Sequence, residues 1–310
     1  MRQEEINRAK QFWDQTDGDK IRNVSWTAIH YFEEQIARRL TKSREGGRIH
    51  PLANASASFV WGMLTSRVPE ENHESLIGCT LVCGDMKGER LYFENASGVR
   101  FCEVHGYDLS SKSLARYEPK DIKFHAHIMD CNDLTLEREH FHLIVGSHGI
   151  HHVMNVGGLF YQAHKAMAPG GLILLHEWIG PNFLQIPWTN RWVARLLLYT
   201  LFPKRASRTM QDGIMKGRWI MPPPDALEPS EACNSEELWD QYVRFFRPLH
   251  SVFYGGLVFP IFEGLGHLFN ADRWTHRIRV RIIYALERLF TKLRFIKPLF
   301  VTTIGETRLN

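Results

Sequence analysis

A glycine-containing turn follows an apolar run at residues 81–89, where the sequence is LVCGDMKGE, and Asp108 ends the next apolar run. A turn of this kind leads from a strand into a helix and presents backbone N–H groups to an anionic part of a cofactor. Gly84 lets the backbone approach a ligand closely because it has no side chain. An acid about twenty residues later is placed to hold the hydroxyls of a ribose. The pattern predicts a nucleotide-binding βαβ unit.

The charges beside this turn separate two classes of cofactor. Asp85 and Glu89 place two carboxylates there. They would repel a diphosphate but can bind the amino group of an aminocarboxylate, such as the methionine end of S-adenosylmethionine. Val82 and Met86 stand where such loops usually carry glycine, and a strained loop residue costs about 1–3 kcal/mol, enough to weaken cofactor binding. The alternative is a plain strand-to-helix turn that binds no ligand.

Two acids end successive apolar runs after the turn. Asp108, followed by Leu109, can accept hydrogen bonds from both ribose hydroxyls. The alternative is that Asp108 or Ser110 caps the next helix. Asp130, followed by Cys131, ends the third run and can bind the amino group of an adenine.

A histidine run follows the fourth apolar run, at the edge where α/β sheets place their ligands. Imidazole takes a proton near neutral pH, and such a transfer is worth roughly 10²–10⁴-fold in rate. We therefore expect His151 or His152 to act as a general base toward a hydroxyl. Two alternatives stay open. Adjacent histidines can cap the following helix, and His148, His152 and His176 could converge on a metal, although their spacing is not that of a known zinc site. No metal is expected.

The next apolar run ends in His176 and Glu177. A buried carboxylate needs a partner, so Glu177 is expected to orient a histidine or to accept a hydrogen bond from the substrate. We expect a group of aromatic, amide and carboxylate side chains to form the acceptor pocket, because such groups stack on a sugar and hydrogen-bond to it. The alternative is that these side chains form a small core of their own. The candidates are His176, Gln185, Trp188, Glu228, Ser230, Glu231 and Tyr254.

The chain alternates between short apolar runs and helical stretches from about residue 76 to 180, which indicates a parallel, doubly wound sheet. The predicted strands are 80–83, 102–107, 123–128, 141–147 and 172–176. The intervening stretches, each with room for about one helix, are 87–97, 110–117 and 155–168. Proline and glycine at 168–171 predict a tight turn before the last of these strands.

The flanking segments are mainly helical. Apolar residues recur at helical spacing in 1–45 and in a segment from about 53 to 65, and helices are also expected at 235–247 and from 273 to about 297. The segment 181–235 is expected to be an ordered insertion that covers the carboxyl edge of the sheet. These features predict a helical region at 1–72, a cofactor-binding core at 73–180, and a cap at 181–310 that holds the remaining strands and a basic C-terminal helix.

Composition excludes several classes of protein. The chain has 310 residues, of which 44% are apolar and 23% charged, and its net charge of +4 is too mild to indicate a nucleic-acid partner. Five cysteines without a CxxC pair argue against a disulfide framework and favour a reducing cytoplasm. There is no signal-peptide pattern and no apolar run long enough to span a bilayer. The basic C-terminal helix either contacts an anionic inner-membrane surface or only packs its apolar side on the domain.

The ordered motifs resemble the class I S-adenosylmethionine-dependent methyltransferases. The motifs, which span about residues 79–181, are LVCGDMKGE, HGYDLS, HIMDCNDL, FHLIVGSHGIHHV and KAMAPGGLILLHEWIGP. Segments that further resemble a bacterial branch associated with surface-glycan and other polysaccharide gene clusters are IGPNFLQIPWTNRW, PPPDALEPSEACNSEEL and FYGGLVF. The resemblance implies a seven-stranded, mostly parallel Rossmann-like sheet. The cofactor-holding residues that it implies are Cys83, Gly84, Asp108, Asp130, Ser147 and His148.

The sequence therefore predicts an α/β fold with N-terminal helices and a mainly helical C-terminal cap. The expected reaction transfers a methyl group from S-adenosylmethionine, leaving S-adenosylhomocysteine, to a hydroxyl of a sugar or glycan intermediate. The acceptor is expected to be a small molecule or a glycan, with no oligomeric state predicted. Two rival hypotheses are a small-molecule methyltransferase of secondary metabolism, acting on carbon, nitrogen or a phenol, and a non-catalytic binding or scaffold protein with a decayed cofactor loop.

Overall fold

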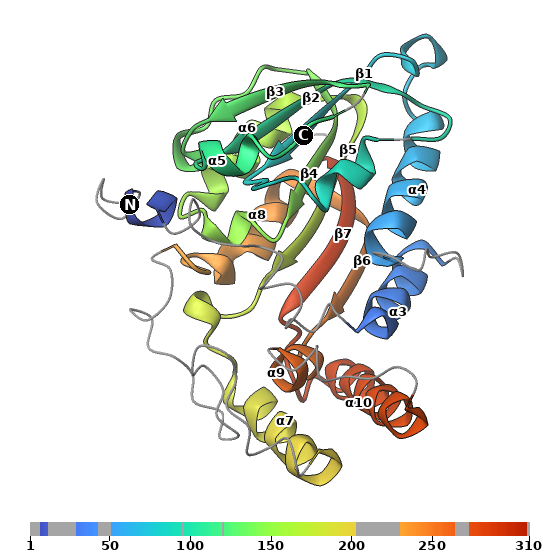
Figure 1. Ribbon diagram of the computed structural model, residues 1–310, viewed down its shortest axis with the longest axis vertical. Helices are drawn as coiled ribbons and strands as arrows, with labels where there is room; N and C mark the ends of the chain where they lie inside the picture. The colour runs from blue at the N-terminus through green and yellow to red at the C-terminus, as the bar shows by residue number, and fades with distance from the viewer. Residues whose placement is uncertain are drawn as a thin grey trace.

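A seven-stranded sheet forms the centre of the molecule, with the strand order β3-β2-β1-β4-β5-β7-β6 (Figure 1). The structure is a computed structural model that describes residues 7–11, 29–42, 51–94, 96–119, 121–202, 230–263 and 273–308. The strands are β1 (Leu76–Leu81), β2 (Phe101–Asp108), β3 (Lys123–Ile128), β4 (Phe141–Ser147), β5 (Met167–Trp178), β6 (Phe246–Tyr254) and β7 (Phe300–Thr307). Strands β1 to β5 pair in parallel, and β7 runs antiparallel to both β5 and β6. The predicted doubly wound, mostly parallel sheet is confirmed.

Two strands have the predicted bounds, and two differ for local backbone reasons. Strands β3 and β4 lie where expected, whereas β1 ends before Val82 because Val82 takes a φ of 51° and leaves the ladder. The predicted turn at 168–171 is wrong, because those residues belong to β5. Gly170 takes a φ of 77°, and a Cβ on it would lie 2.5 Å from the carbonyl oxygen of Arg67. Glycine is needed at position 170 because the strand is irregular there and the backbone of Arg67 passes close by.

The helices between the strands are shorter than predicted in two of three cases. The segment 155–168 contains α6 (Val156–Ala166), as expected. The segment 110–117 contains only α5 (Ser111–Leu114), and 87–97 contains only the 3₁₀ helix η3 (Glu89–Tyr92). The Tyr92 carbonyl accepts a hydrogen bond from Trp61 Nε1 at 2.8 Å, so α4 uses an acceptor that a longer helix would need.

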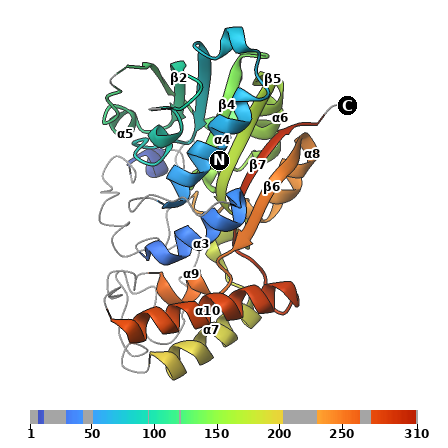
Figure 2. The same ribbon diagram turned by 90° about the vertical axis from the view of Figure 1, so that its right-hand side faces the viewer.

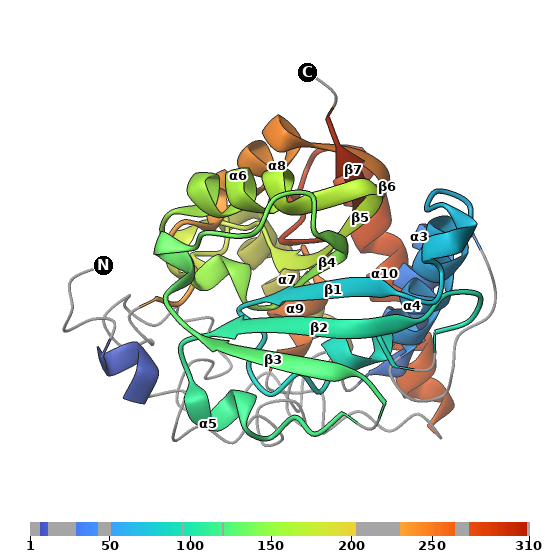
Figure 3. The ribbon, with the colours of Figure 1, turned by 90° about the horizontal axis from the view of Figure 1, so that it is seen from above.

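Helices cover both faces of the sheet (Figure 3). One face packs against α3 (His30–Thr41) and α4 (Pro51–Thr65), and the other against α6 and α8 (Leu238–Phe245). Alternation along β4 explains the two cores, because Leu143 and Val145 face the first and Ile144 faces the second. The helices predicted at about 53–65 and within 1–45 are confirmed for the residues that the structure describes.

A group of helices lies beyond the carboxyl end of β5 (Figures 1 and 2). It consists of α7 (Trp188–Leu201), α9 (Val258–Phe262) and α10 (Trp274–Lys292). The buried Glu287 carboxylate of α10 accepts hydrogen bonds from the backbone N–H groups of Gly255, Leu257 and Val258 at 2.8–2.9 Å, which fixes α10 against the start of α9. The predicted C-terminal helix is confirmed as α10.

The segment 235–247 divides into a 3₁₀ helix at Ser235–Glu237, then α8, and then the first residues of β6. The predicted helix is therefore too long at its C-terminal end. Strands β6 and β7 come from the segment 181–310 but complete the same sheet as the core, and the three-part division of the chain stays a prediction. Residues 203–229 of the predicted insertion lie outside the described residues. Within the described part of the chain, no helix is long and apolar enough to cross a membrane.

Candidate active site

The strand order reverses between β1 and β4, and the loops that follow these two strands meet at this point. A Cβ on Gly149, after β4, would lie 2.2 Å from the carbonyl oxygen and 2.8 Å from the Cβ of Val82, after β1. Only glycine fits there. In open α/β sheets, ligands bind beyond the carboxyl ends of the strands at such a reversal.

The turn after β1 has three residues in the left-handed region. Val82, Gly84 and Met86 take φ angles of 51°, 53° and 55°. This conformation suits glycine, and a β-branched residue in it is an outlier. The Met86 side chain is fully buried in the core. This packing offsets the strain at Met86. Val82 is only half-buried, so its packing offsets less of the strain that its backbone conformation puts on the loop.

Asp108, at the end of β2, holds this turn in place. One carboxylate oxygen accepts the backbone N–H of Gly84 at 2.8 Å, and the other accepts that of Ser110 at 2.8 Å. Asp108 therefore joins the turn after β1 to the start of α5. Among the described residues, a Cβ on Gly84 would meet no atom within 4 Å, so the space beside the turn is open. The cap of α5 is Ser110, whose side chain accepts the N–H of Ser113.

The neighbouring predicted contacts are local. Cys83 is buried and donates its N–H to the Tyr107 carbonyl at 3.3 Å. Asp85 forms an ion pair with Lys87, with 3.5 Å between Oδ2 and Nζ. Leu109 is half-buried in the bend between β2 and α5. Of these residues, Cys83 is linked directly to β2, and the contact of Asp85 stays within the turn.

The end of β3 is tied to the loop before α6. Asp130 caps the 3₁₀ helix Cys131–Asp133, its Oδ1 accepting the backbone N–H of Asn132 at 2.9 Å. Asn132 Oδ1 in turn accepts the N–H groups of Met154 and Asn155 at 2.8 and 2.9 Å. The sequence analysis did not single out Asn132, although an amide directly after a strand-end acid is a signal that could have found it.

His176 is buried in β5, between β4 and β7. Ser147 pairs in register with His176, and His148 donates its N–H to the His176 carbonyl at 2.9 Å. The two rings lie 4.2 Å apart. Burial, followed by the nearby His148, lowers the pKa of His176 well below its usual value, so its ring is neutral. Its Nε2 has no hydrogen-bond partner among the described residues, and such a nitrogen is suited to a ligand.

Glu177 organises the loop after β4. It is fully buried, and Oε1 accepts the N–H groups of Gly149 and Ile150 at 2.7 Å each. Oε2 lies 2.8 Å from Nδ1 of His151. Burial opposes ionisation, but the His151 charge and hydrogen bond lower the pKa of Glu177. The carboxylate therefore fixes both the loop and the first histidine of the adjacent pair.

Glu231 faces both histidines from the cap. It lies 3.4 Å from Nε2 of His151 and 4.0 Å from Nε2 of His152. His152 Nδ1 is 3.2 Å from the hydroxyl of Ser230. Although burial opposes it, the charges of Glu177 and then Glu231 raise the pKa of His151 to about 10. Burial likewise opposes the ionisation of Glu231, but His152 and His151 lower its pKa to about 2. His151 is therefore a cation between two carboxylates at neutral pH and cannot take a proton.

The other predicted acceptor residues lie apart from this group. Gln185 is exposed and bonds to the Phe183 carbonyl at 3.3 Å, and Trp188 is 69% exposed at the start of α7. Tyr254 is buried, with its ring 6.0 Å from that of His176. Glu228 lies outside the described residues. Of the predicted acceptor set, Glu231 and Ser230 are the members with contacts to the histidine pair.

Comparison with known proteins points to one class. Residues 88–210 match the family model of a methyltransferase domain. An S-adenosylmethionine-dependent methyltransferase from Mesorhizobium loti is similar over 83% of this chain and 100% of its own, with 19% identity and a TM-score of 0.41. A geranyl diphosphate C-methyltransferase from Streptomyces coelicolor A3(2) is similar over 99% of both chains, with 12% identity and a TM-score of 0.48. No curated protein sequence matches the chain.

The matched domain and the sheet order with one antiparallel strand define a class I methyltransferase fold. The chain is an S-adenosylmethionine-dependent methyltransferase, an enzyme of EC 2.1.1.-. The residues present fit the cofactor, because the space beside Gly84 is open, the Asp108 carboxylate is of the kind that binds hydroxyls and lies at this turn, and His176 offers a buried nitrogen. The finer resemblance to a glycan-associated branch stays a prediction.

Proposed function

We propose that this enzyme methylates a hydroxyl and that the acceptor is a sugar or glycan intermediate. The observation that carries the proposal is the group Glu177–His151–Glu231–His152 at the carboxyl edge of β4 and β5. A hydroxyl must lose its proton as it is methylated, and this group contains a base held beside a carboxylate. S-adenosylmethionine, when bound, supplies an electrophilic methyl group on a positively charged sulfur.

His152 is the proposed general base. With its Nδ1–H donated to the Ser230 hydroxyl, the Nε2 lone pair can accept the hydroxyl proton. The Glu231 carboxylate, 4.0 Å from Nε2, stabilises the imidazolium that forms. His151 stays protonated and acts as a positioning residue, because it holds Glu231 between the two rings. An in-line displacement then depends mainly on alignment of the hydroxyl oxygen with the methyl group.

The proposed acceptor class follows from what lines this edge. Glu231 and Ser230, which contact the histidine pair, can hydrogen-bond to hydroxyls. A carboxylate and a hydroxyl together suit the hydroxyl groups of a sugar ring. A hydroxyl-rich acceptor fits this combination.

The test measures methyl transfer from radiolabelled S-adenosylmethionine to a panel of sugar nucleotides and glycan fragments. His152→Ala is expected to lower kcat about 10²–10⁴-fold, with S-adenosylhomocysteine affinity unchanged by calorimetry. His152→Ala should also abolish the acidic limb of the pH–rate profile, which a purely structural role would leave in place. The matched control is His164→Asn, on α6. Unchanged turnover in His152→Ala, or product methylated on carbon or nitrogen, would refute the proposal.

We further propose that α10 contacts an anionic lipid surface, which would place the enzyme at the inner face of a cytoplasmic membrane. Its exposed face alternates arginines with large apolar side chains, namely Trp274, Arg277, Ile278, Arg281, Ile282, Arg288 and Leu289. Such a face suits the headgroup region of a bilayer. Co-sedimentation with phosphatidylglycerol vesicles tests this. Binding should be lost in Arg277→Glu/Arg281→Glu, and equal binding of this variant and wild type would contradict it.

A further inference from the structure

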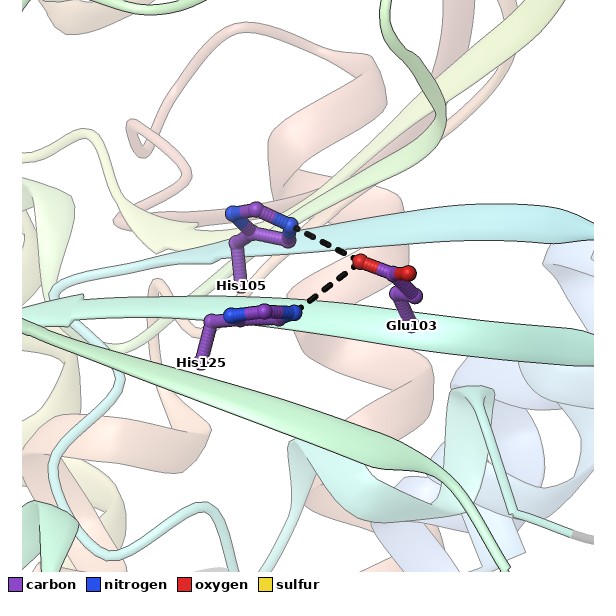
Figure 4. Close-up of side chains that lie close together, drawn as sticks. All are labelled: Glu103, His105 and His125. Atoms are coloured by element: carbon purple, nitrogen blue, oxygen red, sulfur yellow. Dashed lines mark hydrogen bonds and ion pairs between the residues drawn. The ribbon is translucent and has the colours of Figure 1, made fainter.

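A second cluster of histidines and a carboxylate lies on the sheet, away from the carboxyl edge (Figure 4). Glu103 and His105 are two residues apart on β2, so both point to the face covered by α6 and α8. His125 lies directly opposite His105 on β3. Glu103 points toward both rings, and all three residues are half-buried.

The donor atoms of this cluster have the separations of a metal site. Glu103 Oε2 is 2.9 Å from His125 Nε2 and 3.8 Å from His105 Nε2. One donor atom from each residue lies within 4.8 Å of the other two. Ligands bound tetrahedrally at about 2.0–2.1 Å stand about 3.3 Å apart. Small side-chain movements would therefore suffice for all three to bind one ion.

The hydrogen bonding of the His105 ring favours a cation between this ring and Glu103. His105 Nδ1 is 3.1 Å from Nε2 of His127. When Nδ1 donates its hydrogen there, the Nε2 lone pair faces the carboxylate. His105 Nε2 has no hydrogen-bond partner among the described residues. Two electron-rich atoms facing each other are stabilised by a cation between them.

The cluster is also rigid and reachable. Its residues are on adjacent paired strands, and the His105 ring stacks on those of His125 and His127 with centroids 4.5 and 5.2 Å apart. The connection from β3 to β4 at 129–140 contains one short 3₁₀ helix, Cys131–Asp133, where a longer helix would cover this face. Ligands on regular strands hold their geometry better than ligands on loops.

We propose that Glu103, His105 and His125 bind a divalent transition-metal ion of the zinc type, with His127 as the positioning residue for His105. Two imidazoles and one carboxylate suit zinc rather than magnesium or calcium, which prefer oxygen ligands. The donated Nδ1–H of His105 is the outer-shell contact that fixes a ligating histidine. The ion would clamp β2 to the edge strand β3.

A second group, His151, His152 and Glu231, also has donor atoms within 4.8 Å of one another. There the cationic His151 already neutralises the carboxylates, so a metal ion would have to displace a proton from a group whose pKa is about 10. Metal binding requires deprotonated ligands. The β2–β3 cluster is therefore the site that we assign to the ion.

The experiment titrates the chelator-treated full chain with Zn²⁺ by calorimetry and by competition with a chromophoric chelator. Glu103→Gln and His125→Asn should each lose one equivalent of bound Zn²⁺ or weaken it more than about 100-fold, and His127→Asn should weaken it about 10- to 100-fold. His152→Asn and the surface control His164→Asn should keep the wild-type affinity. Wild-type affinity and stoichiometry in Glu103→Gln and His125→Asn would overturn the proposal.

A measurement without variants guards against misfolding. X-ray absorption of the wild-type protein with one equivalent of Zn²⁺ should show two imidazole ligands and only nitrogen or oxygen donors. Co²⁺ should replace the ion and give a visible spectrum of low-coordinate type. Absence of imidazole scattering, or no binding of either ion by the wild type, would refute the site.

Discussion

The two histidine–carboxylate groups of this protein use the same residue types and have opposite protonation. At the carboxyl edge, Glu177 and Glu231 enclose His151, and its pKa rises to about 10. On the face of β2 and β3, one carboxylate meets several imidazoles, and the pKa of His105 falls to about 4. Burial disfavours the charged form of the histidine in both groups, and the ratio of carboxylates to imidazoles then decides whether the ring is a cation or neutral. The first group suits charge stabilisation in a reaction, and the second suits a metal ion.

The backbones beneath the two groups also differ. The loops around the edge group hold Val82, Met86 and His148 at φ angles of 51–55°, which are unfavourable for residues with side chains. The other cluster lies on regular strands in register. Strained backbone that the surrounding structure maintains is concentrated at functional sites. The contrast supports the proposal that the reactive chemistry occurs at the carboxyl edge.

The largest expected difference between the two groups is in the cost of losing the carboxylate. Glu177→Ala should lower the free energy of unfolding by about 3–5 kcal/mol, because it leaves the cationic His151 and two buried N–H groups without their acceptor. Glu103→Gln should cost less than about 1 kcal/mol, because Glu103 is a third exposed. Urea unfolding in the presence of EDTA measures both. Equal losses would show that burial does not separate the groups.

The sequence was sufficient for the parts of this site that depend on local pattern. Periodicity located β3 and β4, and it predicted that Asp108 ends a strand, whereas the hydrogen bond from Gly84 to Asp108 required the structure. The identity of the base was left open between His151 and His152, because the distinction depends on Glu231, about eighty residues away and brought in only by folding. Strands β6 and β7 were not located individually, since their pairing is likewise long-range.

The β2–β3 cluster had a signal that the sequence analysis did not use. Glu103 and His105, like His125 and His127, alternate along a strand and so share a face. Register decides whether two such strands bring their histidines opposite each other, and register is set by the whole sheet. The pattern alone could suggest a shared face, whereas the pairing of His105 with His125 required the structure.

A smaller effect is expected from restoring glycine to the cofactor turn. Val82→Gly should relieve about 1–3 kcal/mol of backbone strain, partly offset by about 0.5–1 kcal/mol of extra backbone entropy in the unfolded chain. We expect a net gain of stability of about 0–2.5 kcal/mol and tighter binding of S-adenosylhomocysteine, because the substitution removes a side chain from the cofactor turn.

The matched variant of Val82→Gly is Met86→Gly, since both residues have positive φ. Met86 is fully buried, so its removal leaves a cavity that costs about 2–5 kcal/mol and outweighs the relief of strain. The two variants should therefore change stability in opposite directions, as measured by urea unfolding and calorimetry. Destabilisation by both would mean that Val82 is retained for packing as well.

The last comparison concerns the pH dependence of stability, where the two groups should act in opposite directions. His151 has its pKa raised from 6.5 to about 10, so its stabilising contribution is complete below pH 6.5 and is lost as pH rises toward 10. His105 has its pKa lowered from 6.5 to about 4, so its contribution is present above pH 6.5 and is lost as pH falls toward 4. The Glu231 contribution, with a pKa lowered from 4.5 to about 2, is lost only at lower pH.

These signs predict a maximum of stability near pH 6.5, with His151 contributing to the alkaline side and His105, together with His176, to the acidic side. In metal-free buffer, His105→Asn should flatten the acidic side of the profile and leave the alkaline side unchanged. His151→Asn should reduce stability overall and flatten the alkaline side, because the cation between Glu177 and Glu231 is gone. Urea unfolding across the pH range measures all three proteins. Profiles that stay parallel to that of the wild type in both variants would show that neither histidine has a shifted pKa, and the contrast between the two groups would then be one of position alone.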